Sequence, residues 1–195
     1  MVTQSVASPR TGRPSRPLTT EQWSAVDPPR WRLSFDGGRE QVAYAHVAMR
    51  NYNSVHNALT VYRGYRDRGV VSKAPGMFSN DPVAGLRAML AAGKVRDAGE
   101  VTVAGRTVRR LVSVERIPQP RGHQFVQRTT YDLDPKTFAP IGGTLQFDIG
   151  PARKLTLTFH VDRYERLPLN AENAKLLTIP TNAQTKVTVH QLHRP

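Results

Sequence analysis

The chain contains no cysteine in 195 residues. Without a thiol it can form no disulfide, no thiolate metal site and no cysteine nucleophile. It also lacks any run of about 18 apolar residues, so we expect no membrane-spanning helix. The first twenty residues lack the apolar core of about seven or more residues that a secretory signal peptide needs. These absences indicate either a cytoplasmic protein or an exported protein whose N-terminus is incomplete here.

Acidic residues are scarce: 15 stand against 28 basic residues, a formal net charge of +13. Basic side chains that neutralise phosphates drive non-specific binding to nucleic acid. Of the 28, however, 22 are arginines scattered between Arg10 and Arg194 without a long basic block. A dispersed set contacts few phosphates at once, so we disfavour nucleic acid as the partner and rank an anionic lipid surface above it.

Groups arranged for catalysis are also missing. No pair of carboxylates lies in a turn, and the histidines stand alone on expected strands. His190 and His193 have a spacing that suits metal binding only on a helix, whereas their surroundings are typical of a strand or tail. The glycine pairs at 37–38 and 142–143 lack the strand-to-helix context of a phosphate loop and indicate turns. We expect no enzyme, no metal site and no cofactor.

Residues 80–94 are the segment with a complete set of helix signals. Asn80 or Asp81 can cap the first amides, Pro82 suits the first turn, and Gly93 fits the end. Four apolar side chains recur at helical spacing and predict a buried stripe. At about 1.5 to 3 kcal/mol for each large side chain removed from water, this stripe must pack against a sheet. Its members are Val83, Leu86, Met89 and Leu90.

Most of the remaining chain alternates between apolar and polar residues, the pattern of half-buried strands. We expect a disordered basic tail rich in proline, serine and threonine over residues 1–17, and a single domain over residues 18–195. The domain is predicted to hold about nine or ten strands, with one return strand at 40–49, a turn at 51–53, a short helix at 171–177 and a last strand at 186–192. The predicted fold is mainly β, a curved antiparallel meander sheet or half-open β-barrel with one central helix on its concave face.

The predicted ligand site is the apolar concavity of this sheet. A helix of three turns is about 15 Å long and covers only part of such a face. Large exposed apolar patches seldom persist on monomers, so a partner or ligand is expected on the rest. The alternative is that the aromatic residues fill a closed core. The candidate residues are Leu86, Met89, Leu90, Trp31, Phe35, Phe125, Leu145, Phe147, Leu157 and Phe159.

Several short pieces occur in a particular order: Pro-Pro-Arg-Trp-Arg at 28–32, the hairpin through Tyr44 to Tyr52, the Asp81-Pro82 helix, Val-Thr-Val-Ala-Gly-Arg at 101–106, the segment 131–140 and Arg-Leu-Pro-Leu at 166–169. This order resembles the bacterial lipoprotein-carrier superfamily, which includes periplasmic lipoprotein chaperones and an anti-sigma-factor regulator. The resemblance covers roughly residues 18–190. The carrier's arginine before the strand proline is replaced here by Asp27.

This resemblance implies a non-catalytic binding protein that holds an acyl chain, or a lipidated or apolar partner, in a half-barrel. It also implies a location in the periplasm or cell envelope, with a lipid, an acylated protein or another envelope protein as partner. The alternative from the residues alone is a cytosolic basic module that binds nucleic acid or protein.

Overall fold

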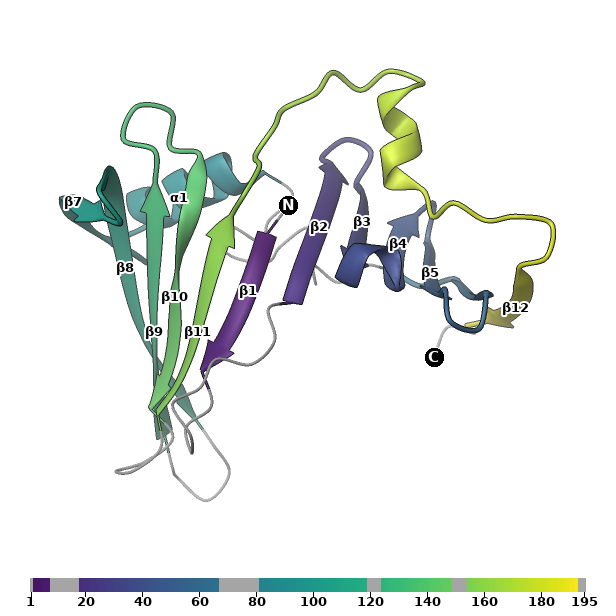
Figure 1. The fold of residues 1–195 in the computed structure, drawn as a ribbon, viewed down its shortest axis with the longest axis horizontal. Coiled ribbons are helices and arrows are strands. Elements are labelled where there is room, and N and C mark those ends of the chain that lie inside the picture. The colour runs from purple at the N-terminus through teal and green to yellow at the C-terminus, as the bar shows by residue number, and fades with distance from the viewer. Residues whose placement is uncertain (1, 8–17, 67–80, 119–123, 149–153, 193–195) are drawn as a thin grey trace.

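The computed structural model describes residues 2–7, 18–66, 81–118, 124–148 and 154–192. These residues form one sheet of twelve strands in the order β12-β6-β5-β4-β3-β2-β1-β11-β10-β9-β8-β7, with one α-helix (Figure 1). The outermost strands, β7 and β12, do not pair with each other, so the sheet is open and not a closed barrel. The prediction of a mainly β fold with a single α-helix is confirmed.

The strands are β1 (Val2–Ala7), β2 (Leu18–Ala25), β3 (Arg30–Phe35), β4 (Glu40–Ala45), β5 (Ala48–Asn53), β6 (Ala58–Arg63), β7 (Arg96–Val103), β8 (Arg106–Pro118), β9 (Gln124–Leu133), β10 (Pro140–Asp148), β11 (Lys154–Val161) and β12 (Lys186–Gln191). The helix is α1 (Pro82–Ala91), and two 3-10 helices are η1 (Asp36–Gly38) and η4 (Asn173–Leu177). We call β7 to β11 with α1 the helix-side half, and β2 to β6 with β12 the meander half.

In the meander half, the predicted single strand at 40–49 is two strands. His46 and Val47 form the turn between β4 and β5, with φ of 51° and 58°. A β-branched residue rarely takes positive φ, so this segment carries no turn signal and is typical of a continuous strand. The turn predicted at 51–53 falls inside β5, and the chain turns instead at residues 54–57.

β1 joins the two halves of the sheet. The sequence predicts a disordered tail over 1–17, but residues 2–7 pair antiparallel with β11 along their whole length. They also pair with β2 over three residues, Leu18 to Thr20. The valines and threonine of this segment suit a strand, and two neighbouring strands supply its main-chain partners. Residues 8–17 of the predicted tail lie outside the described residues.

α1 begins and ends as its sequence predicts. The Asp81 side chain accepts a hydrogen bond from the Ala84 amide at 3.1 Å, and Gly93 takes a φ of 66° just after the helix. Leu90 is half-buried, and the other three stripe residues, Val83, Leu86 and Met89, are buried. They pack in a core cluster with Val95, Leu111, Tyr131, Leu133, Phe138 and Phe159.

The glycine pair at 142–143 lies inside β10 and does not form the predicted turn. A Cβ on Gly143 would lie 2.6 Å from the ring of Phe159 and 2.0 Å from the Thr130 carbonyl oxygen. Glycine is therefore needed here for close packing of Phe159 against the neighbouring strand.

The C-terminal part of the chain returns to the meander half. Residues 162–172, which we call the strap, leave β11 and pass over the end of the sheet to η4 (Figure 1). The predicted last strand is present as β12, and the predicted helix at 171–177 is the 3-10 helix η4. β12 runs parallel to β6, so the sheet departs from the predicted antiparallel meander at this edge.

Two faces of the sheet can be followed through the register. Residues directly opposite each other in paired strands share a face. Phe159 pairs with Gly143, which pairs with Tyr131, so this row lies under α1 on what we call the inner face. Val2 lies opposite both Val161 and Thr20, which carries the inner face into the meander half.

Candidate functional site

The ten predicted site residues share one side of the molecule. Three belong to α1, and the register places the other seven on the inner face that α1 covers. Leu145 lies opposite Leu157, and Phe35 lies opposite Thr20. The alternation of apolar residues therefore places these side chains on one face even where the strands are far apart in sequence.

Half of the predicted residues are packed in cores. Leu86 is completely buried, and Met89 and Phe159 belong to the same cluster, with Leu90 packed partly against it. Trp31 is 3% exposed and stacks on Tyr44, with ring centroids 6.1 Å apart. In this conformation these side chains contribute packing rather than an open surface.

The other half is partly accessible. Phe125, Leu145, Phe147 and Leu157 are half-buried and lie further along the same strands, outside the cluster that α1 covers. The Phe125 and Phe147 rings meet edge to face at 5.8 Å. We call these four residues the inner strip. Phe35 lines a separate small hollow of about 260 Å³.

The larger cleft lies elsewhere, at the end of the sheet that the strap crosses. It has a volume of about 740 Å³ and contains none of the ten predicted residues. β1 reaches only the first three residues of β2, and the remainder of β2 borders the cleft. Its walls are residues 21–27, Asp81 and Pro82 at the start of α1, Pro140, Val161, the strap segment 163–169, and Asn173, Leu176 and Leu177.

Exposed apolar side chains gather around this cleft. Val26 is 62% exposed, Leu167 44% and Leu169 51%. Tyr164 and Leu176 add half-buried surface beside them. Apolar side chains that are exposed together, rather than singly, mark binding surfaces.

The strap is tied to the start of α1 by an ion pair. Arg166 Nη2 donates to both carboxylate oxygens of Asp81, at 2.7 and 2.6 Å. Burial raises the pKa of Asp81, but the amide of Ala84 and the guanidinium of Arg166 outweigh this and hold the pKa below its ordinary value. Hydrogen bonds to Tyr164 and Asp81 raise the pKa of Arg166. Asp81 therefore stays ionised while it both caps the helix and fixes the strap.

The segment that follows the strap and η4 is fixed to the meander half. Arg32 Nη1 donates to the Thr178 carbonyl oxygen at 3.0 Å, and Asn173 Nδ2 donates to the Pro168 carbonyl oxygen at 2.9 Å. Ile179 is buried among the apolar residues of β4, β5 and β6. The roof of the cleft is thus a chain segment anchored on both sides.

Two ion pairs link neighbouring strands of the sheet. Asp132 is 7% exposed and accepts two hydrogen bonds from Arg110, at 2.6 and 2.9 Å. Asp97 pairs with Arg109, and this guanidinium, chiefly through its hydrogen bond, lowers the pKa of Asp97. Over the described ranges, no three of the histidine, aspartate and glutamate side chains gather as metal ligands would. The described helix is too short to cross a membrane.

Sequence reasoning placed no ligand in the cleft because its walls are irregular. Leu167 and Leu169 sit in Arg-Leu-Pro-Leu, which has no strand or helix periodicity, and Val26 is the last residue of a predicted strand over 18–26, just before the Asp27-Pro28 turn. The signal that could have indicated the cleft was the pair of leucines on either side of Pro168, in a segment that is neither helix nor strand and so has no regular way to bury them.

No protein-family model matches the chain, and no curated protein matches it. Among solved structures, the chain is similar to one described as the crystal structure of an uncharacterized conserved protein from Thermus thermophilus. The two share 14% identity over 97% of this chain and 91% of that one, with a TM-score of 0.45. This likeness assigns neither a family nor an activity.

Proposed function

We propose that the protein is a non-catalytic binding protein that holds one apolar chain, the acyl chain of a lipid or of a lipidated partner, in the cleft beneath the strap. The observation that carries the proposal is the exposed apolar wall of Val26, Leu167 and Leu169 around a cleft of about 740 Å³. This volume is within the range of about 300 to 1,000 Å³ that is usual for ligand sites.

The charges of the cleft favour an apolar occupant. Arg166 pairs with Asp81, Arg163 pairs with Glu165 at 2.7 Å, and the indole N–H of Trp23 donates to Glu21. Side chains that already satisfy one another contribute little to holding a charged ligand. The remaining driving force is burial of apolar surface, about 0.8 kcal/mol for each methylene. A chain of about ten methylenes would supply the roughly 8 kcal/mol of micromolar binding before its entropic costs.

The resemblance to lipoprotein carriers supports the same class of ligand. It adds a proposed location in the periplasm or cell envelope and an acylated protein as a proposed partner. The inner strip of Phe125, Leu145, Phe147 and Leu157 is a second apolar surface. It lies on the face of the sheet that α1 covers, and this position corresponds better than the cleft does to the ligand concavity that the resemblance implies. The experiment must therefore distinguish the cleft from the inner strip.

The test is displacement of a fluorescent fatty acid from the purified chain. Val26→Asp and Leu167→Asp change exposed side chains of the cleft, and each is expected to weaken binding at least about tenfold. Val55→Asp is the matched control, because Val55 is 59% exposed in the turn between β5 and β6, outside the cleft lining. Its affinity should equal that of the parent.

Three results would overturn the proposal in different ways. Absence of saturable fatty-acid binding by the parent would mean that the protein does not bind acyl chains. Binding that both cleft variants retain, but that Leu157→Asp abolishes in a folded protein, moves the ligand to the inner strip. Tight DNA binding that persists from about 50 to 200 mM salt would favour the basic interaction module instead.

A further inference from the structure

The last strand, β12, offers main-chain groups at the edge of the sheet. The amides of Lys186 and Leu192 donate to the carbonyl oxygens of Asn57 and Arg63, both at 2.9 Å. In a strand, successive N–H and C=O groups point to alternate sides. The even-numbered residues of β12 therefore face β6, and the amides and carbonyls of Val187, Val189 and Gln191 face away from it.

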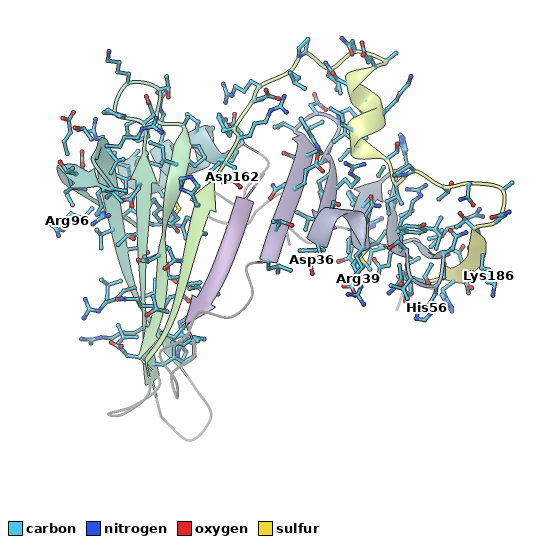
Figure 2. All side chains as sticks on the ribbon, viewed as in Figure 1. Asp36, Arg39, His56, Arg96, Asp162 and Lys186 are labelled. Carbon is cyan, nitrogen blue, oxygen red and sulfur yellow. The ribbon has the colours of Figure 1, made fainter. Side chains whose placement is uncertain are left out.

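The two edges of the sheet differ in how well they are protected. Figure 2 labels Arg96 in β7 and Lys186 in β12 at opposite ends of the molecule. β7 has a bulge between Asp97 and Glu100 and several charged residues, features that hinder pairing with another strand. β12, with the sequence Lys-Val-Thr-Val-His-Gln, has no acidic residue, glycine or proline, and its register with β6 is continuous. Of the two edge strands, β12 is therefore the one that can pair with a further strand.

β12 also borders a buried apolar cluster. Val187 lies opposite Leu59, and Val189 lies opposite Val61. Leu59 and Val61 are buried with Ile179, whereas Val187 is 57% exposed and Val189 48%. A further strand beside β12 would cover the flank of both valines and extend this cluster.

We propose that a second copy of this chain pairs with β12, strand to strand and antiparallel, around a two-fold axis at Val189. In this register Val189 lies opposite its own counterpart, Val187 opposite Gln191, and Thr188 opposite His190. All three residues whose main-chain groups face outward then find partners, and no like charges stand opposite each other. A register centred on Thr188 instead places Lys186 opposite His190 and leaves Gln191 beyond the paired strand.

This self-complementarity is the reason for choosing a second copy over an unrelated peptide. Closed two-fold dimers are the commonest oligomers, and they require a patch that matches itself. Two six-residue strands bury less than the roughly 1,000 Å² of a stable interface, so the dimer should dissociate on dilution. The interface lies outside the cleft lining and does not depend on the proposed function.

The first test is sedimentation equilibrium of the full chain from about 5 to 500 μM, a range chosen for a weak interface. The average mass should rise from 21.7 kDa toward twice this value. Val189→Lys places two charges opposite each other at the axis and should keep the protein monomeric throughout. Val114→Lys is the matched control, because Val114 is 53% exposed on β8, at the far side of the sheet from β12, and this variant should dimerise like the parent.

The second test uses the natural absence of cysteine. Opposed residues of a hydrogen-bonded antiparallel pair have Cα atoms about 5.5 Å apart, within the range that a disulfide spans. Val189→Cys should therefore form a disulfide-linked dimer on mild oxidation, many times faster than Val114→Cys. A parent that is monomeric at the highest concentration, a Val189→Lys variant that dimerises normally, or equal cross-linking of the two cysteine variants would each overturn the proposal. So would pairing of β12 with an added extended peptide by a parent that stays monomeric.

Discussion

The two halves of the sheet differ in the faces that they bury: the main core of the helix-side half lies on one face, whereas the meander half buries apolar residues on both. In the helix-side half, α1 covers the inner face, and the outer face carries polar pairs such as Arg110 with Asp132 and Thr130 with Thr144. In the meander half, Ile179 covers the outer face, where Ala43 is buried. Strands in both halves alternate between apolar and polar residues, so this pattern alone does not determine which face becomes the core. The face is determined by the element that packs across the sheet.

β4 shows this difference within a single strand. Ala43 points to the outer face and Tyr44 to the inner face, and both are buried. Ala43 packs beneath Ile179, while Tyr44 packs against Trp31 and Tyr65. The meander half therefore has two thin apolar layers, each smaller than the single cluster under α1. We expect substitutions in the helix-side half to cost more.

The largest expected effect is that of Leu86→Asp. Leu86 is completely buried between α1 and the sheet, so the new carboxylate has neither water nor a partner. The cost of several kcal/mol is comparable with a total stability of about 5 to 15 kcal/mol, and the variant should be largely unfolded. Circular dichroism and urea titration measure this. A melting temperature within a degree or two of the parent would mean that α1 is not docked.

Ile179→Ala should have a smaller effect in the meander half. Ile179 is 9% exposed in a cluster that contains two alanines, and its truncation should cost about 2 kcal/mol, at the lower end for such changes. Urea denaturation gives the difference in free energy of unfolding, with Leu86→Ala as the comparison. If Ile179→Ala costs as much as Leu86→Ala, the proposed ranking of the two halves is wrong.

The strap between the halves should give the smallest effect, through pH. The pKa of Asp81 in the folded state is lowered from 3.8, so its contribution is complete above about that pH and is lost as the pH falls through the folded value. Because Arg166 is 64% exposed, we expect less than about 1 kcal/mol, weaker still in salt. Asp81→Asn retains a capping side chain and should flatten this part of the pH profile.

A flattened profile is measured by urea denaturation between about pH 2 and 6, the interval in which carboxylates titrate. Arg166→Gln is the companion variant, since it removes the charge partner and leaves the cap. An unchanged acid dependence in both variants would show that the ion pair does not stabilise the fold.

Much of the local structure was predictable because its causes lie close together in the sequence. Asp81, Pro82 and Gly93 mark the ends of α1, and the three-and-four spacing of its apolar residues marks the buried side. The alternation in β11 placed Leu157 and Phe159 on one face, as the register shows. These features depend on backbone periods of 3.6 and 2 residues, which the order of residues alone specifies.

The site was less predictable because it is made by contacts between distant residues. Asp81 and Arg166 are 85 positions apart, and Arg32 and Thr178 are 146 apart. Neither pair carries a local signal, since an arginine and an aspartate anywhere on a basic surface look the same in the sequence. Asp81 and Arg166 both line the cleft, which is formed by segments that come together only in the folded chain.

The sequence by itself therefore determined the helix, most of the strands and, in regular strands such as β11, which apolar side chains share a face. Only the tertiary structure decided that β1 joins the two halves, that His46 and Val47 turn the chain, and that β12 runs parallel to β6. The physical reason is that strand pairing and the covering of a face are chosen by the free energy of long-range contacts. The periodicity of apolar residues identifies the apolar face of a strand or helix, but it does not identify the element that packs on that face.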